Sequence, residues 1–207
     1  MSVIKNRFKL ILIILSVLLT TALTVNSTLA YVLQAGKLNK GVVNQTYYVG
    51  IDNQTLSAEC VQAFADWNYA VQNTNETRNM GFSFTRSDRI TGTTIRCWAE
   101  NQTNQEWYGI TKFYTLDSKL NATEVEHYNN RDYADCIINL RFYDWTYTEP
   151  TRLQWKSIMA HEIGHALGLL HTNSDGDVGK LMYQGFNVRT ATSATRDEVL
   201  GIYHKYS

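Results

Sequence analysis

Residues 161–171 read His-Glu-Ile-Gly-His-Ala-Leu-Gly-Leu-Leu-His, and this segment restricts the possible folds more than any other. On a helix, His161 and His165 lie four residues apart on one face, so their rings can bind the same metal ion. Gly168 can adopt the positive φ that ends a helix and turns the chain sharply. Such a turn returns His171 to the other two histidines. The segment therefore predicts a helix, a glycine turn and a three-histidine metal site.

The type of ligand indicates the type of site. Three neutral nitrogen ligands with an open fourth position are typical of catalytic zinc, whereas structural zinc is closed by four protein ligands. Glu162 follows the first histidine and can reach the water that zinc activates without binding the ion itself. The alternative is a chance pattern of histidines on a helix surface. Gly168 and His171 are also in register, and three of the five histidines of the chain lie here, which argues against chance.

A methionine turn follows the histidines at Leu181-Met182-Tyr183. The order His-Glu-x-x-His-x-x-Gly-x-x-His and then methionine is the metzincin signature, and among metzincins the chain most resembles the matrixins, the matrix-metalloprotease type. Thr172 stands where matrixins carry a small hydroxyl residue. The resemblance is specific over residues 157–206 and loose elsewhere, and the closing segment matches at Asp197, Gly201, Ile202 and Tyr206.

The resemblance implies an α+β zincin fold, with a twisted mixed sheet of five strands, two long helices and a C-terminal helix. It implies one catalytic zinc on His161, His165 and His171, with Met182 as an apolar floor beneath them. Zinc would polarise a peptide carbonyl, and Glu162 would act as the general base. We therefore expect a zinc endopeptidase that acts on a protein or peptide substrate.

The chain departs from the matrixin pattern at several places. Gln184 replaces the proline that usually follows Met-Tyr, Glu198 replaces an aspartate, and Lys205 replaces an apolar residue. A Pro-Arg-Cys-Gly switch segment is absent, and so are the histidine and aspartate runs for structural zinc and calcium. Asp175-Gly176-Asp177 is a calcium candidate, but Gly and Asp also dominate ordinary turns, so a surface turn is the favoured interpretation.

The amino-terminal segment predicts secretion. Lys5, Arg7 and Lys9 precede an apolar run over residues 10–19, and Thr28-Leu29-Ala30 supplies small residues for a signal peptidase. We expect a signal peptide at residues 1–30 and a catalytic domain at residues 31–207. The alternative is an uncleaved membrane anchor, although the run is shorter than the approximately 20 apolar residues that span a bilayer.

The composition favours one domain and excludes some partners. The formal net charge is zero and no basic stripe is present, which argues against nucleic acid as a partner. A single proline and the lack of low-complexity sequence argue against linkers. We expect a monomer without stable membrane association after signal cleavage.

Apolar periodicity and turn residues predict the secondary structure. A first helix is expected from Ala58 to about Gln72 with Ser57 as its cap, a second over residues 151–167, and a last one from Thr195, which forms a capping box with Glu198. Strand composition predicts five strands, at Thr46–Ile51, Gly81–Thr85, Thr93–Ala99, Trp107–Thr115 and Cys136–Phe142.

The substrate is expected to bind as an added strand along a sheet edge. The resemblance places that edge at Trp107–Thr115, so Trp107, Tyr108 and Gly109 are candidate substrate-binding residues together with Tyr183. A strand that only packs is the alternative. Residues 183–192 should wall the pocket beside the zinc. Phe186, and the absence of any charge there except Arg189, predict a preference for apolar side chains.

Three cysteines remain after signal cleavage, at positions 60, 97 and 136. An odd number leaves one thiol unpaired, and three pairings are possible. Cys97 and Cys136 lie on strands that are neighbours in the matrixin sheet, so the resemblance favours a disulfide between them.

Two other functions remain open from the sequence. One is a non-catalytic secreted module that binds zinc, although such a module has no use for the Glu162 carboxylate. The other is zinc hydrolysis of a non-peptide amide, such as a linkage in a cell wall.

Overall fold

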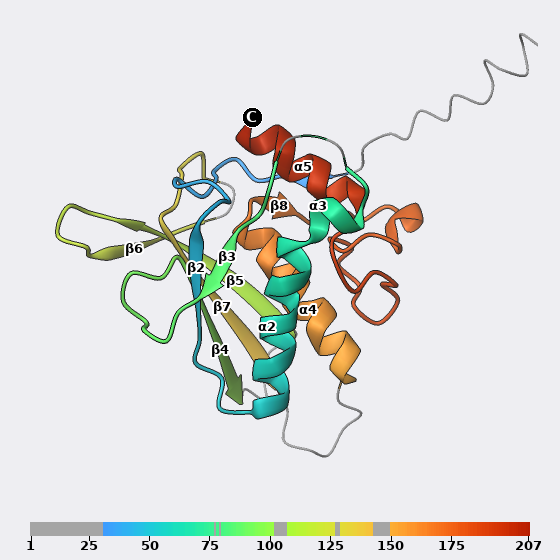
Figure 1. Ribbon diagram of the computed structural model, residues 1–207, viewed down its shortest axis with the longest axis horizontal. Helices are drawn as coiled ribbons and strands as arrows, with labels where there is room; N and C mark the ends of the chain where they lie inside the picture. The colour runs from blue at the N-terminus through green and yellow to red at the C-terminus, as the bar shows by residue number, and fades with distance from the viewer. Residues whose placement is uncertain (1–30, 77, 79, 102–106, 127–128, 143–149) are drawn as a thin grey trace, which may run out of the picture.

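The computed structural model describes residues 31–207 apart from positions 77, 79, 102–106, 127–128 and 143–149. The expected signal peptide at residues 1–30 lies outside the described residues. Within the described part, no helix has the length and hydropathy to cross a membrane. Figure 1 shows helices packed on one face of a sheet, which confirms the expected α+β class.

The main sheet has six strands in the order β3-β2-β4-β7-β5-β6, one more than predicted. The first four run parallel, and β5 and β6 are antiparallel to their neighbours. Their bounds are β2 Gln45–Val49, β3 Phe84–Arg86, β4 Ile95–Asn101, β5 Gly109–Leu116, β6 Ala122–Val125 and β7 Asp135–Phe142. The unpredicted strand is β6. It was missed because it is short and buries only Val125, so its sequence lacks the apolar alternation of a half-buried strand.

A second sheet was also missed, because each of its strands has only two residues. In it, β1 (Val32–Leu33) pairs antiparallel with β8 (Leu169–Leu170). This pair fixes the chain immediately before His171. The amino-terminal segment of the described chain therefore helps to position the last histidine of the motif.

Two long helices cover one face of the sheet (Figure 1), α2 (Gln54–Asn68) and α4 (Arg152–Ala166). Helix α2 begins four residues earlier than predicted because its cap is Asn53, whose side chain accepts a hydrogen bond from Leu56 N at 3.1 Å. The helix ends at Asn68 and is followed by the short α3 (Ala70–Asn73). Helix α4 has the predicted extent, with a Thr151 cap.

The closing helix α5 (Arg196–Tyr206) lies across one end of the two long helices (Figure 1). Thr195 and Glu198 form its predicted capping box. Its apolar face, including Val199 and Ile202, is fully buried in the core. The helix therefore closes the core behind the metal motif.

Helices α2 and α4 are joined by a buried tryptophan. Trp67 is fully buried and its indole Nε1 donates a 2.9 Å hydrogen bond to the carbonyl oxygen of Ala160, one residue before the motif. Tyr47 of β2 stacks on Phe64 of α2, with 3.8 Å between ring centroids. These aromatic contacts hold the helix that carries the histidines against the sheet.

The expected disulfide between Cys97 and Cys136 is wrong. All three cysteines are free and fully buried. Cys136 is opposite Ile95, and Cys97 is opposite Ile138, so the two cysteines are offset by two residues along parallel strands. Strand spacing and rise then separate their Cα atoms by roughly 8 Å, beyond the approximately 7 Å that a disulfide can bridge.

Candidate metal centre

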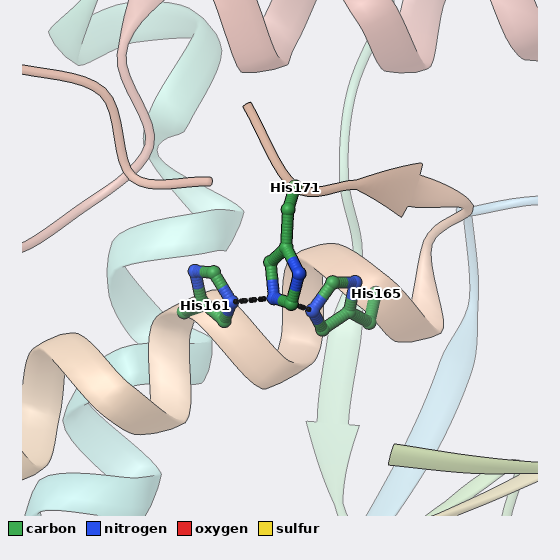
Figure 2. A group of neighbouring side chains, drawn as sticks. All are labelled: His161, His165 and His171. Carbon is green, nitrogen blue, oxygen red and sulfur yellow. Dashed lines mark hydrogen bonds between the residues drawn. The ribbon is translucent and has the colours of Figure 1, made fainter. Parts of the chain in front are cut away.

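Helix α4 and the turn after it bring the three histidines together. His161 and His165 project from the same face of α4, and His171 approaches from the segment after β8 (Figure 2). The turn depends on Gly168, whose φ of +97° lies in the left-handed region that favours glycine. An added Cβ there would also lie 2.4 Å from the Lys205 side chain. The predicted helix, turn and third histidine are all present.

The three rings meet at their Nε2 atoms. His171 Nε2 lies 3.0 Å from His161 Nε2 and 3.1 Å from His165 Nε2. Three nitrogens at approximately 2.0–2.1 Å from a tetrahedral ion lie about 3.3 Å apart, so these spacings fit a bound zinc. In the part of the chain that the structure describes, these three residues are the one cluster of histidine, cysteine or acidic side chains that could hold a metal ion.

The outer nitrogens of two rings have backbone partners. Nδ1 of His161 lies 2.7 Å from the Leu181 carbonyl oxygen, and Nδ1 of His165 lies 2.8 Å from that of Leu169. Donation to these carbonyls puts the proton on Nδ1 and leaves the Nε2 lone pair for a metal. Burial, more than any other influence, lowers the pKa of His161. The lowered pKa keeps its ring neutral.

Arg189 also approaches His161, with its Nη1 atom 2.7 Å from Nδ1. Nδ1 cannot both donate to Leu181 and accept from Arg189. Metal binding through Nε2 requires the neutral ring to carry its proton on Nδ1, so the donating tautomer is the consistent choice. One N–H of Nη1 donates to the Tyr183 carbonyl oxygen at 2.9 Å, and in this tautomer the approach of Nη1 to Nδ1 is a contact and not a hydrogen bond.

Glu162 is buried between α4 and β5. Thr111 Oγ1 donates a 2.7 Å hydrogen bond to Oε2 of Glu162 and fixes the direction of the carboxylate. Burial raises the pKa of Glu162 to about 7, against the lowering effect of the Thr111 hydrogen bond and of Arg189. A carboxyl group with such a pKa can both accept and release a proton near neutrality.

Gly109 leaves the space that Glu162 occupies. A Cβ at this position would lie 2.7 Å from Cγ and 2.8 Å from Oε1 of Glu162. The first residue of β5 must therefore have no side chain if the carboxylate is to keep its place. Gly109 therefore has a structural role, which is to leave room for the Glu162 side chain. The sequence alone marked Gly109 only as a substrate-binding candidate.

Met182 packs against the helix that carries the histidines. Its side chain is almost fully buried, and its Sδ would be 2.4 Å from a Cβ at Gly164 of the motif. The Met182 backbone N–H donates to Oε1 of Glu198 at 3.2 Å. A buried carboxylate of α5 thus fixes the methionine turn.

Two cavities adjoin the centre, one on each side of Glu162. The first cavity, about 390 Å³, follows β5 from Gly109 to Phe113 and includes His165. The second cavity, about 380 Å³, includes His161 and has walls from Trp107, Tyr108, Gly109, Phe186 and Arg189. Of the substrate-binding candidates, Trp107, Tyr108 and Gly109 line a cavity.

Tyr183 does not line either of these two cavities. It makes a bridge with Thr172, and its carbonyl oxygen is occupied by Arg189. Tyr183 therefore contributes to the pocket only through its carbonyl oxygen, which holds the Arg189 side chain.

The edge prediction needs a similar correction. β6 pairs with β5 from Phe113 to Leu116, so that half of β5 is not an edge. Gly109 to Lys112 pair with β7 on one side of β5. On the other side, the one that faces β6, they pair with no strand of the described chain. Only the half of β5 beside Glu162 can accept an added strand.

Two residues of the centre were missed from the sequence. Thr111 orients Glu162, and Gln34 is a buried residue whose Nε2 donates to the carbonyl oxygens of His165 (2.9 Å) and Leu169 (3.3 Å). Both reach the motif from distant parts of the chain, so local spacing could not reveal them. Asp177, from the calcium candidate, instead forms an ion pair with Lys180 at 2.8 Å.

Comparison with known proteins identifies the family. Over 66 residues the chain is 36% identical to matrix metalloproteinase-23 of Rattus norvegicus and of Mus musculus, which is 28% of this chain and 16% of each relative. The chain thus aligns with less than a fifth of the length of these relatives. The crystal structure of myroilysin aligns with 86% of this chain and 65% of its own at 16% identity and a TM-score of 0.34. The matrixin family model matches residues 37–207, most of the chain, and the protein therefore belongs to the matrixin family of peptidases.

Proposed function

We propose that this protein is a secreted zinc endopeptidase. The observation that carries the proposal is the meeting of three histidine rings beside a buried glutamate, with His171 Nε2 3.0 and 3.1 Å from the Nε2 atoms of the other two. His161, His165 and His171 would hold the zinc and leave a fourth position open, which distinguishes a catalytic site from a structural one. Membership of a peptidase family supports protein as the substrate.

Glu162 would carry out the proton transfers. Zinc, when bound, supplies Lewis acidity that polarises the peptide carbonyl and lowers the pKa of water. The Glu162 carboxylate would take a proton from the attacking water and then give it to the nitrogen of the leaving amine. Thr111 holds Oε2 and Gly109 makes room for Oε1, so the group is oriented before substrate binds.

The free half of β5 would hold the substrate as an added strand. Gly109 to Lys112 provide unpaired main-chain groups beside Glu162, and such groups bind extended peptides in many recognition domains. Antiparallel pairing is the commoner arrangement. In that direction, residues before the scissile bond lie along the first cavity, and the residue after it enters the second cavity.

The test compares the full chain with its Glu162→Gln variant. We expect about one zinc per chain in both proteins, and cleavage of an unfolded protein only by the first. Chelation should abolish this cleavage and added zinc should restore it. Equal proteolysis by Glu162→Gln would rule out Glu162 as the base. Zinc binding without proteolysis would favour the non-catalytic module, and release of amide fragments from a cell-wall preparation alone would favour the non-peptide hydrolase.

Secretion rests on residues 1–30 and has its own test. Sequencing the amino terminus of the exported protein should give Tyr31 as the first residue. Retention of residues 1–30 in a membrane fraction would instead support the uncleaved anchor.

A further inference from the structure

Arg189 stands out as a cation in the pocket beside the metal site. It lies on the segment after the methionine turn and lines the second cavity with His161 and Glu162. Its side chain is half-buried. Arginine is normally paired when it is withdrawn from water.

No carboxylate of the described residues forms a salt bridge with Arg189. Nε donates to Ser157 Oγ at 3.1 Å, and Nη1 donates to the Tyr183 carbonyl oxygen at 2.9 Å. Nη2 makes no hydrogen bond with the described residues and is not sealed from solvent. Two N–H donors of the guanidinium therefore remain available to a ligand.

The rest of the cavity wall increases the effect of this charge. Tyr108 and Phe186 pack together with 4.3 Å between ring centroids, and Ile158 lies in the same wall. Apolar walls exclude water and strengthen the attraction between a cation and an anion. Glu162 lines the same cavity, but it forms no salt bridge with Arg189, and its Oε2 accepts the hydrogen bond from Thr111 of β5.

We propose that Arg189 makes this pocket select an acidic side chain, aspartate or glutamate, at the substrate residue that follows the cleaved bond. A carboxylate would accept hydrogen bonds from Nη2 and form the salt bridge that Arg189 lacks among the described residues. This inference rests on the proposed endopeptidase function and replaces the apolar preference expected from the sequence. A guanidinium that only ties the loop to α4 through Ser157 would give no such selection.

Cut sites provide the first test. The zinc-loaded full chain is incubated with a mixture of unfolded proteins, and the new termini are identified by mass spectrometry. Aspartate and glutamate should be enriched directly after the cuts. A predominance of leucine and other apolar residues at this position would overturn the inference while leaving the peptidase function intact. A complete lack of cuts would contradict the peptidase function itself.

Matched peptides provide the second test. Peptides that share one sequence carry glutamate or glutamine after the cleaved bond, and the ratio of their kcat/KM values is measured. We expect a ratio of at least about 10 for the unmodified chain, near 1 for Arg189→Gln, and above 1 for Arg189→Lys. Arg196→Gln is the control, since Arg196 lies on the exposed side of α5 and pairs with Glu76. A ratio near 1 in the unmodified chain, or one that Arg189→Gln leaves unchanged, would overturn the inference.

Binding gives a readout that is independent of catalysis. In the Glu162→Gln background, the uncleaved glutamate peptide should bind about tenfold more tightly than the glutamine peptide, as measured by fluorescence anisotropy. Adding Arg189→Gln should remove this difference. Equal affinities in the presence of Arg189 would count against a selective guanidinium.

Discussion

Glu198 links the closing helix to the methionine turn, and replacing it by glutamine tests that link. Its Oε1 accepts a hydrogen bond from Met182 N at 3.2 Å, and its Oε2 accepts from Thr195 N at 2.8 Å and from Thr195 Oγ1 at 2.5 Å. The side chain is almost completely buried. A glutamine amide keeps one acceptor oxygen and puts a donor at the other position, so at least one buried N–H loses its partner.

The loss of stability can be estimated from these contacts. A buried donor left without a partner costs about 1–3 kcal/mol, and a hydrogen bond to a charged group exceeds a neutral one by about 1 kcal/mol. One lost bond and two weakened ones together destabilise the fold by about 3–5 kcal/mol. For a domain of this size, that corresponds to a fall in Tm of roughly 6–20 °C.

Urea unfolding followed by tryptophan fluorescence measures this change. Glu124→Gln is the control, because Glu124 is exposed and forms only a 3.4 Å surface ion pair with Lys112, so the change should be below about 0.5 kcal/mol. Glu198→Gln should also weaken zinc binding, since it loosens the turn beneath the histidines. A loss of stability below about 1 kcal/mol for Glu198→Gln would refute the reasoning.

Two further predictions concern β5 and β2. Gly109→Ala should reduce kcat/KM by about 100-fold or more at unchanged zinc content, because its Cβ would lie 2.7 Å from Cγ of Glu162; a reduction below threefold would contradict this contact. Burial raises the pKa of Tyr47 to about 12. The unfolded chain therefore ionises first, and the stability that the buried phenol contributes is present below about pH 10 and is lost from about pH 10 to 12. Urea midpoints measured across this range should fall less steeply in Tyr47→Phe, and an identical slope would show that Tyr47 does not contribute.

The local elements of this protein could be predicted because their signals are local. Helix α4 follows from its histidine spacing and the glycine turn at Gly168, and the same spacing predicted the metal site directly. Helix α5 follows from the capping box of Thr195 and Glu198. The predicted start of helix α2 was four residues too late because Ser57 and Asn53 are both good caps. Only the folded structure shows which of the two side chains accepts the capping hydrogen bond.

The features that were missed depend on contacts between distant segments. The register of β4 and β7 decides that Cys97 and Cys136 cannot form a disulfide, and two strand sequences alone do not specify a register. Thr111 and Gln34 reach the motif from other parts of the chain. Arg189 was noted only as a charge, because its lack of an ion-pair partner becomes visible only in the folded pocket.

The most direct test of the account is the identity of the atoms that bind zinc. X-ray absorption spectroscopy of the zinc-loaded full chain should show nitrogen or oxygen ligands at about 2.0–2.1 Å, imidazole scattering from three histidines, and no sulfur. His171→Ala should lose one imidazole and most of the zinc affinity. Sulfur scattering near 2.3 Å, or a spectrum that His171→Ala leaves unchanged, would contradict the three-histidine centre.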